Sequence, residues 1–149
     1  MSRRQLPRWV LAALVSAASL PALADECKPV LKEGWVNLPP VPEPMMLAGY
    51  GRIENPCKQA VSVASASSPA FMHVGLHRSE IVDGMSRMRA IGELPLAPGS
   101  TATLAPGGLH LMLMHPSAPV KEGDKVAVTL KLKDGREVAG VLVVKQAAP

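Results

Sequence analysis

Histidine and methionine, two residue types that bind transition metals, are concentrated in one part of this sequence. Apart from Met1 there are seven methionines and four histidines, and nine of these eleven residues lie within residues 72–115. Imidazole nitrogen binds many transition metals, whereas thioether sulfur selects soft ions such as Cu(I) and Ag(I). Methionine also fills gaps in hydrophobic cores. The composition therefore indicates either a Cu(I) site or ordinary core packing.

The spacing of these residues favours a site on the face of a sheet. His110 and Met112 are two residues apart, so in a strand they project from the same face. The opposite face of that strand would carry Leu109, Leu111 and Leu113. His77 ends another expected strand, and Met88 follows the Asp83-Gly84 turn signal. Two imidazoles and two thioethers would thus be available near the rim of a β-structure.

The same four residues resemble the copper-binding signature of a known family. Ten residues separate His77 from Met88, twenty-one separate Met88 from His110, and one separates His110 from Met112. With the surrounding segments 83–89, 106–114 and 121–124, this pattern is similar to that of the periplasmic PCu(A)C copper chaperones. The resemblance covers roughly residues 45–145.

The resemblance implies an all-β, cupredoxin-like Greek-key sandwich or barrel with a surface Cu(I) site. Its ligands would be His77, Met88, His110 and Met112. It also implies delivery of copper to the CuA centre of cytochrome c oxidase, either to subunit II directly or through a thiol-bearing assembly factor. A periplasmic protein that only sequesters copper is the alternative. The sequence departs from the family at Gly75 and Arg78, where acidic residues are common, and Arg78 could weaken metal binding or alter docking of a partner.

Other histidines and methionines are weaker candidates. His73 shares strand parity with His77, and Met114 shares it with Met112, so each could lie near the metal, although packing or solvent exposure is the simpler interpretation. Met72 and His115 have the opposite parity and are interpreted as bystanders. Met85 could cover the site as an apolar neighbour.

Short strands are the elements expected to position these residues. Fifteen prolines and twelve glycines interrupt the chain too often for long helices. Strands are predicted at 46–54, 59–66, 71–78, 85–91, 101–104, 126–132 and 136–145, with Asp134-Gly135 as the turn of the last hairpin. The pattern itself, without the resemblance, indicates a β-sandwich or Greek-key barrel at residues 45–149.

The first 24 residues read as a cleavable signal peptide for export to the periplasm. Three arginines in the first eight residues precede an apolar run, and Ala22-Leu23-Ala24 has the small-x-small pattern of a cleavage site. A membrane anchor is the alternative, but about a dozen apolar residues is short of the roughly 20 that a bilayer requires. No later segment could span a membrane. Residues 25–44 are expected to be an extended, proline-rich segment before the domain.

The two cysteines, Cys27 and Cys57, are predicted to form a structural disulfide, because exported proteins fold in an oxidising compartment. A redox-active or metal-binding thiol pair is the alternative. It is less favoured because the two residues lack the close spacing of such motifs.

Composition argues against two further functions. From residue 25 onward there are 13 basic and 12 acidic residues and only three aromatic ones, so the chain lacks the charge and the stacking surface of a nucleic-acid binder. No hydrolase elbow, zinc-protease motif or phosphate loop is present. The expectation is a copper-binding protein that is not an enzyme.

Overall fold

The computed structural model describes residues 26–147, and the predicted signal peptide at 1–24 lies outside them. Within this range every regular element is a β-strand, which confirms the predicted all-β fold class. The ten strands are β1 (Val30–Leu38), β2 (Met46–Glu54), β3 (Val61–Ser67), β4 (Phe71–Val82), β5 (Met85–Ala90), β6 (Leu94–Leu96), β7 (Thr101–Leu104), β8 (Leu109–Pro116), β9 (Lys125–Leu132) and β10 (Glu137–Gln146).

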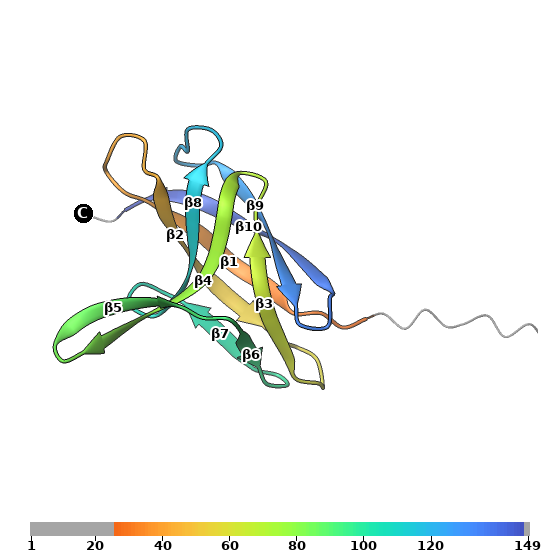
Figure 1. Ribbon diagram of the computed structural model, residues 1–149. Helices are drawn as coiled ribbons and strands as arrows, with labels where there is room; N and C mark the ends of the chain where they lie inside the picture. The colour runs from red at the N-terminus through yellow and green to blue at the C-terminus, as the bar shows by residue number, and fades with distance from the viewer. Residues whose placement is uncertain (1–25, 148–149) are drawn as a thin grey trace, which may run out of the picture.

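The strands form one sheet that closes on itself as a barrel. Their order is β5-β4-β8-β7-β2-β1-β10-β9-β3-β6, and a further pairing between β3 and β4 closes the ring. The first half of β2 pairs with β8 and its second half with β7. The β4–β5 hairpin extends beyond the ring and projects from the body of the molecule (Figure 1).

One strand of the ring was not predicted. Residues 25–44 were expected to form an extended segment before the domain, but Val30–Leu38 is β1, a strand inside the sheet. It pairs antiparallel with β2 and parallel with β10. The proline-rich residues 39–44 connect β1 to β2 without regular structure of their own, apart from a bend. The sheet therefore begins at β1, upstream of residue 45.

Alternation along β8 separates the core from the surface. Leu111 and Leu113 are fully buried, whereas Met112 and Met114 between and beyond them are half-buried. The core is completed by apolar residues of nine of the ten strands, among them Val36, Ile53, Val63, Leu130 and Leu142. Packing of the leucines thus turns the methionine face of β8 outward, as the period of two in a strand requires.

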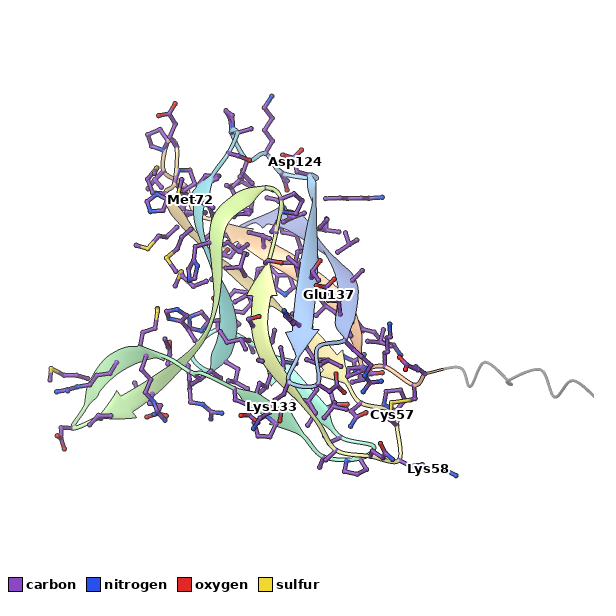
Figure 2. All side chains as sticks on the ribbon, turned by 45° about the vertical axis from the view of Figure 1, so that its right-hand side comes forward. Cys57, Lys58, Met72, Asp124, Lys133 and Glu137 are labelled. Carbon is purple, nitrogen blue, oxygen red and sulfur yellow. A yellow bond between two sulfur atoms is a disulfide. The ribbon has the colours of Figure 1, made fainter. Side chains whose placement is uncertain are left out.

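Cys27 and Cys57 form the predicted disulfide, which closes a loop of 30 residues. Figure 2 shows Cys57 at the end of the molecule remote from Met72, so the disulfide lies away from the histidine- and methionine-rich strands. The pair stabilises the fold rather than contributing to that surface.

Asn55, at the end of β2, organises the loop beside the disulfide. Its side chain is buried; Nδ2 donates to the carbonyl oxygens of Gln59, Leu96 and Ala97, and Oδ1 accepts from the backbone N–H of Cys57. One amide group therefore links the loop at residues 57–59 to residues 96–97, and its bonds with Leu96 and Cys57 are buried.

We expect Asn55→Ala to lower the free energy of unfolding by about 1–3 kcal/mol, because it removes the buried hydrogen bonds with the Leu96 carbonyl and the Cys57 N–H. Urea unfolding of the metal-free protein measures this change. Ser100→Ala is the matched control, since its exposed hydroxyl donates to the same Ala97 carbonyl. Its expected effect is within about 0.5 kcal/mol. Equal effects of the two substitutions would contradict the role assigned to burial.

Candidate metal site

His77 on β4 and His110 on β8 face each other across the two strands. They are a register pair, and their ring centroids are 5.9 Å apart. Directly opposed residues of antiparallel strands project from the same face. The structure therefore brings together the two imidazoles that the sequence analysis selected, although 32 residues separate them in the chain.

His110 is held in one orientation by the turn before β8. Its Nδ1 donates to the Gly108 carbonyl oxygen at 3.0 Å, within the Pro106-Gly107-Gly108 turn. The side chain is only 3% exposed, and its other ring nitrogen, Nε2, is buried without a hydrogen-bond partner. A backbone acceptor on one nitrogen fixes the tautomer and leaves a lone pair on the other, the arrangement typical of metal-binding histidine.

His77 also has a buried nitrogen without a partner, at Nδ1. Burial lowers the pKa of His77 below its ordinary value of 6.5, and the neighbouring His110 and His73 lower it further. The neutral imidazole, which is the form that binds a metal, is therefore favoured at neutral pH. Two buried nitrogens without partners on facing side chains fit a soft metal ion.

We expect an NMR titration of the metal-free protein to show His77 taking up its proton below pH 6.5. Unfolded chains take up that proton at the ordinary pKa. Stability should therefore fall as the pH drops through this ordinary value towards the folded-state pKa. His110→Gln removes one neighbouring imidazole and should raise the pKa of His77. A titration of His77 above pH 6.5 in the parent protein would contradict this account.

Met112 and Met88 lie on the same face as the two histidines. Met112 is the register partner of Gly75, and Met88 is the partner of Ser79. Gly75, His77 and Ser79 alternate along β4, so both methionines flank the position of His77. All four predicted ligands thus occupy one face of β5, β4 and β8. Their assignment as ligands stays a prediction.

None of the methionines within residues 26–147 belongs to the core. Five are exposed and two are half-buried. These are Met45, Met46, Met72, Met85, Met88, Met112 and Met114. Methionine is ordinarily a gap-filling core residue, so core packing, the alternative in the sequence analysis, does not account for them. The same residues contain no group of three or more His, Cys, Asp and Glu side chains placed to hold a harder metal ion.

The weaker candidates lie on the same strands as the four predicted ligands, but not all of them lie on the same face. His73 is exposed, but it is the register partner of Met114 on the face of His77; Met72 and His115 are exposed and have the opposite parity. Met85 pairs with Val82 at the tip of the hairpin, three residues beyond Met88, which does not favour a role as cover for the site. Arg78 directly follows His77 in β4 and so faces the other side of the strand.

Two features of the site were not predicted from sequence. A Cβ atom on Gly75 would lie 3.0 Å from Nε2 of His77 and 3.6 Å from Nε2 of His73, so the missing side chain leaves room for both rings. Tyr50 and Trp35 extend the site as an aromatic row. The ring centroids are 6.4 Å apart between Tyr50 and His110 and 4.8 Å apart between Trp35 and Tyr50.

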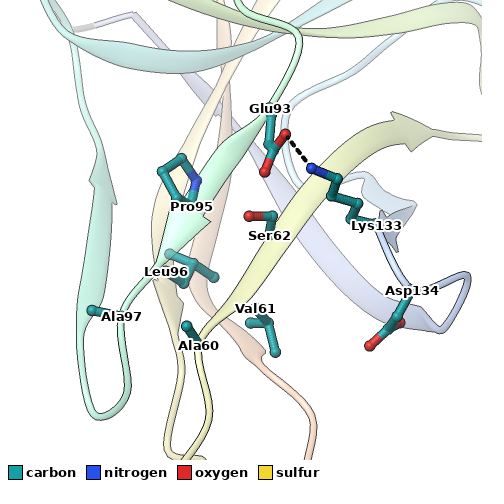
Figure 3. Close-up of a pocket in the computed structure, with 9 residues that line it drawn as sticks. All are labelled: Ala60, Val61, Ser62, Glu93, Pro95, Leu96, Ala97, Lys133 and Asp134. Atoms are coloured by element: carbon teal, nitrogen blue, oxygen red, sulfur yellow. Dashed lines mark hydrogen bonds and ion pairs between the residues drawn. The ribbon is translucent and has the colours of Figure 1, made fainter.

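A hollow of about 570 Å³ lies elsewhere on the molecule, beside β3 and β6 (Figure 3). Glu93 and Lys133 form an ion pair across it at 3.3 Å. Hydrogen bonds from Ser62 and Lys133 lower the pKa of the Glu93 carboxyl group. None of the four predicted ligands lines this hollow, and its charged groups are already paired.

Comparison with known proteins relates the chain to one family. The profile of the family described as "Putative lipoprotein LpqE-like" matches residues 30–144, most of the chain. The protein named "Putative lipoprotein Lxx21020" from Leifsonia xyli is 37% identical over 91 residues, or 60% of this chain. The matched stretch spans 55% of that relative's length.

Solved structures share the fold. The apo-DR1885 protein from Deinococcus radiodurans is 27% identical, with a TM-score of 0.62 over 98% of this chain and 97% of that one. Its Cu(I) form is 29% identical, with a TM-score of 0.57 over 87% and 81% of the two chains. The copper-bound PCuAC domain from PmoF2 is 21% identical, with a TM-score of 0.63 over 78% and 92%, and at this identity shows the fold alone.

Proposed function

This chain belongs to the LpqE-like family and has the fold of PCuAC domains, and on that premise we propose that it is an exported carrier of Cu(I). The resemblance to the PCu(A)C family, which the sequence alone indicated, is thereby confirmed. The single observation that carries the proposal is the His77–His110 pair, with a buried ring nitrogen on each residue that has no protein partner.

The donor set supports copper in its reduced state. Met88 and Met112 share the face of the two histidines, and thioether sulfur is a ligand for Cu(I) rather than for Zn(II) or Mg(II). The neutral state of His77 favours coordination without competition from a proton. Four uncharged ligands would hold a monovalent ion near the surface, where a partner can remove it.

Transfer requires that the partner reach the metal. Met88 is 54% exposed and lies on β5, the outer strand of the projecting hairpin (Figure 1). A ligand on an exposed edge strand can leave the ion without disturbing the barrel core. This geometry suits a carrier better than a closed structural site, which keeps all its ligands inside the protein.

We expect Met88→Ala and Met112→Ala to weaken Cu(I) binding by about 10-fold or more while leaving the unfolding transition of the metal-free protein almost unchanged. Neither thioether is buried in the core, so little packing is lost. Anaerobic titration with Cu(I), followed by Trp35 fluorescence, measures binding. The Trp35 ring lies beside the Tyr50 ring, which in turn lies beside His110. Met85→Ala is the matched control. Unchanged Cu(I) affinity in both variants would show that the thioethers are not ligands.

The location and the recipient complete the proposal. The disulfide, the predicted signal peptide and a family named after a lipoprotein support a role outside the cytoplasm, in the periplasm. The described residues contain no helix of the length and hydrophobicity that crossing a membrane requires. The recipient would be the CuA centre of cytochrome c oxidase, reached through subunit II or a thiol-bearing assembly factor. The chain itself would catalyse no reaction.

A copper-sequestering role is the competing proposal, since it needs the same ligands. The two roles differ under opposite copper supplies. Deleting a carrier should lower oxidase activity when copper is scarce, with recovery on added copper, whereas deleting a sequestering protein should cause sensitivity when copper is abundant. Normal oxidase activity in the copper-starved deletion strain, in a host without a redundant pathway, would reject delivery to the oxidase.

A further inference from the structure

A second group of histidine and methionine residues lies on three neighbouring strands, outside the predicted ligand set. Each strand contributes two adjacent residues of this kind: Met45-Met46 at the start of β2, Met72-His73 in β4 and Met114-His115 in β8. The three pairs are far apart in sequence. Strand pairing alone brings them to the same end of the sheet.

The register places one residue from each pair in a row. Met114 is the partner of His73 on β4 and of Met46 on β2. The backbone N–H of His115 donates to the Met45 carbonyl oxygen at 2.8 Å, so the pairing of β2 and β8 continues past the row. Opposed residues share one face of a sheet, so His73, Met114 and Met46 are side-chain neighbours.

The side chains of this row are more exposed to solvent than those of core residues. Within the row, Met46 is 61% exposed and His73 is exposed, while Met114 is half-buried. Exposed single apolar residues are common, but here thioethers and imidazoles from three strands coincide in one place. Because these residues do little core packing, the stability of the barrel does not explain their presence.

The row continues the face that carries the predicted copper ligands. Met114 lies two residues beyond Met112, a rise of about 7 Å along a strand. Gly75 lies between His73 and His77 on β4, and its missing Cβ leaves Nε2 of each histidine within 3.6 Å of one point. No side chain therefore stands between the two groups on β4.

We propose that His73, Met114 and Met46 form a second binding site for a soft monovalent ion, Cu(I) or Ag(I). The row supplies one imidazole and two thioethers, a donor set that suits such ions. The site is more exposed than the His77–His110 pair, so it should bind its ion more weakly. It is defined by its own residues and does not depend on the proposed carrier function.

Native mass spectrometry of the purified protein with Ag(I) tests the proposal. The parent should bind two Ag(I) ions, the second more weakly. A variant carrying His73→Gln, Met114→Leu and Met46→Leu should bind one, or bind the second at least tenfold more weakly. Met85→Leu, which replaces an exposed methionine on the hairpin tip, should still bind two. Thermal unfolding of each metal-free variant checks that it is folded.

A parent that saturates with one Ag(I), or a triple variant that keeps the second ion at parent affinity, would overturn the second site. If the triple variant fails to fold, Met114→Leu alone serves, because its loss should also weaken the second ion. Met88→Ala separates the two proposals, since it should weaken binding of the first ion and leave the affinity for the second ion unchanged.

Discussion

A His110→Ala variant should lose more than about 100-fold in Cu(I) affinity, the largest effect of any single substitution proposed for this protein. Loss of a residue that only orients a metal ligand costs 10- to 100-fold in affinity in many metal sites. His110 is itself a predicted ligand, so its loss should cost more. Its Nδ1 is bonded to the Gly108 carbonyl, and its Nε2 is the buried nitrogen without a partner. Competition with a chromophoric Cu(I) chelator under anaerobic conditions measures the affinity.

Controls must separate ligand loss from damage to the fold, because His110 is 3% exposed. His115→Ala removes an exposed imidazole from the same strand and should leave the affinity of the first ion unchanged. Thermal unfolding of metal-free His110→Ala shows how much packing is lost. Cu(I) affinity within threefold of the parent, in a folded variant, would mean that the His77–His110 pair does not hold the ion.

Removing the disulfide should have the largest effect on stability. We expect the double variant Cys27→Ser/Cys57→Ser to lose about 3–4 kcal/mol of unfolding free energy, from the entropy that the cross-link removes from the unfolded chain. The loop spans 30 residues. The disulfide also links the segment before β1 to the loop that follows β2, so without it the start of the sheet is no longer held by a covalent bond. Urea unfolding of the oxidised parent and the double variant measures the difference.

Removing the disulfide should not change the affinity for Cu(I). The disulfide lies at the end of the molecule remote from Met72 (Figure 2), and both cysteines lie outside β4 and β8, the strands of the His77–His110 pair. The folded double variant should therefore bind Cu(I) with parent affinity. A large fall in Cu(I) affinity in that variant would indicate that the cysteines contribute to the site. An unchanged unfolding free energy would show that the cross-link does not stabilise the fold.

Most of the strands could be predicted because their signals are local. β2 and β7 coincide with the predicted strands, and the last hairpin follows its alternating residues and the Asp134-Gly135 turn. β1 was missed because it lies in a segment dominated by its proline-rich continuation at 39–44, and its place in the sheet depends partly on a parallel pairing with the distant β10. β6 was missed because it has three residues with a proline at its centre. Such strands depend on long-range pairing rather than on local preference.

The residue types and spacing alone indicated a soft metal ion, with core packing as the alternative. Thioether and imidazole donors select soft ions, and the period of two along β8 already assigned Leu111 and Leu113 to one face and His110 with Met112 to the other. These inferences need only side-chain chemistry and strand geometry. They hold whatever strand lies beside β8.

Only the tertiary structure decided which donors meet. The register between β4 and β8 sets His77 opposite His110, leaves one buried nitrogen on each without a partner, and sets Gly75 opposite Met112. The register between β2 and β8 brings Met46 into line with Met114 and His73. Register follows from burying the leucine faces of several strands at once, and a shift of one residue would turn the predicted ligands to the other face. That condition involves the whole barrel, so no single segment of the sequence carries it.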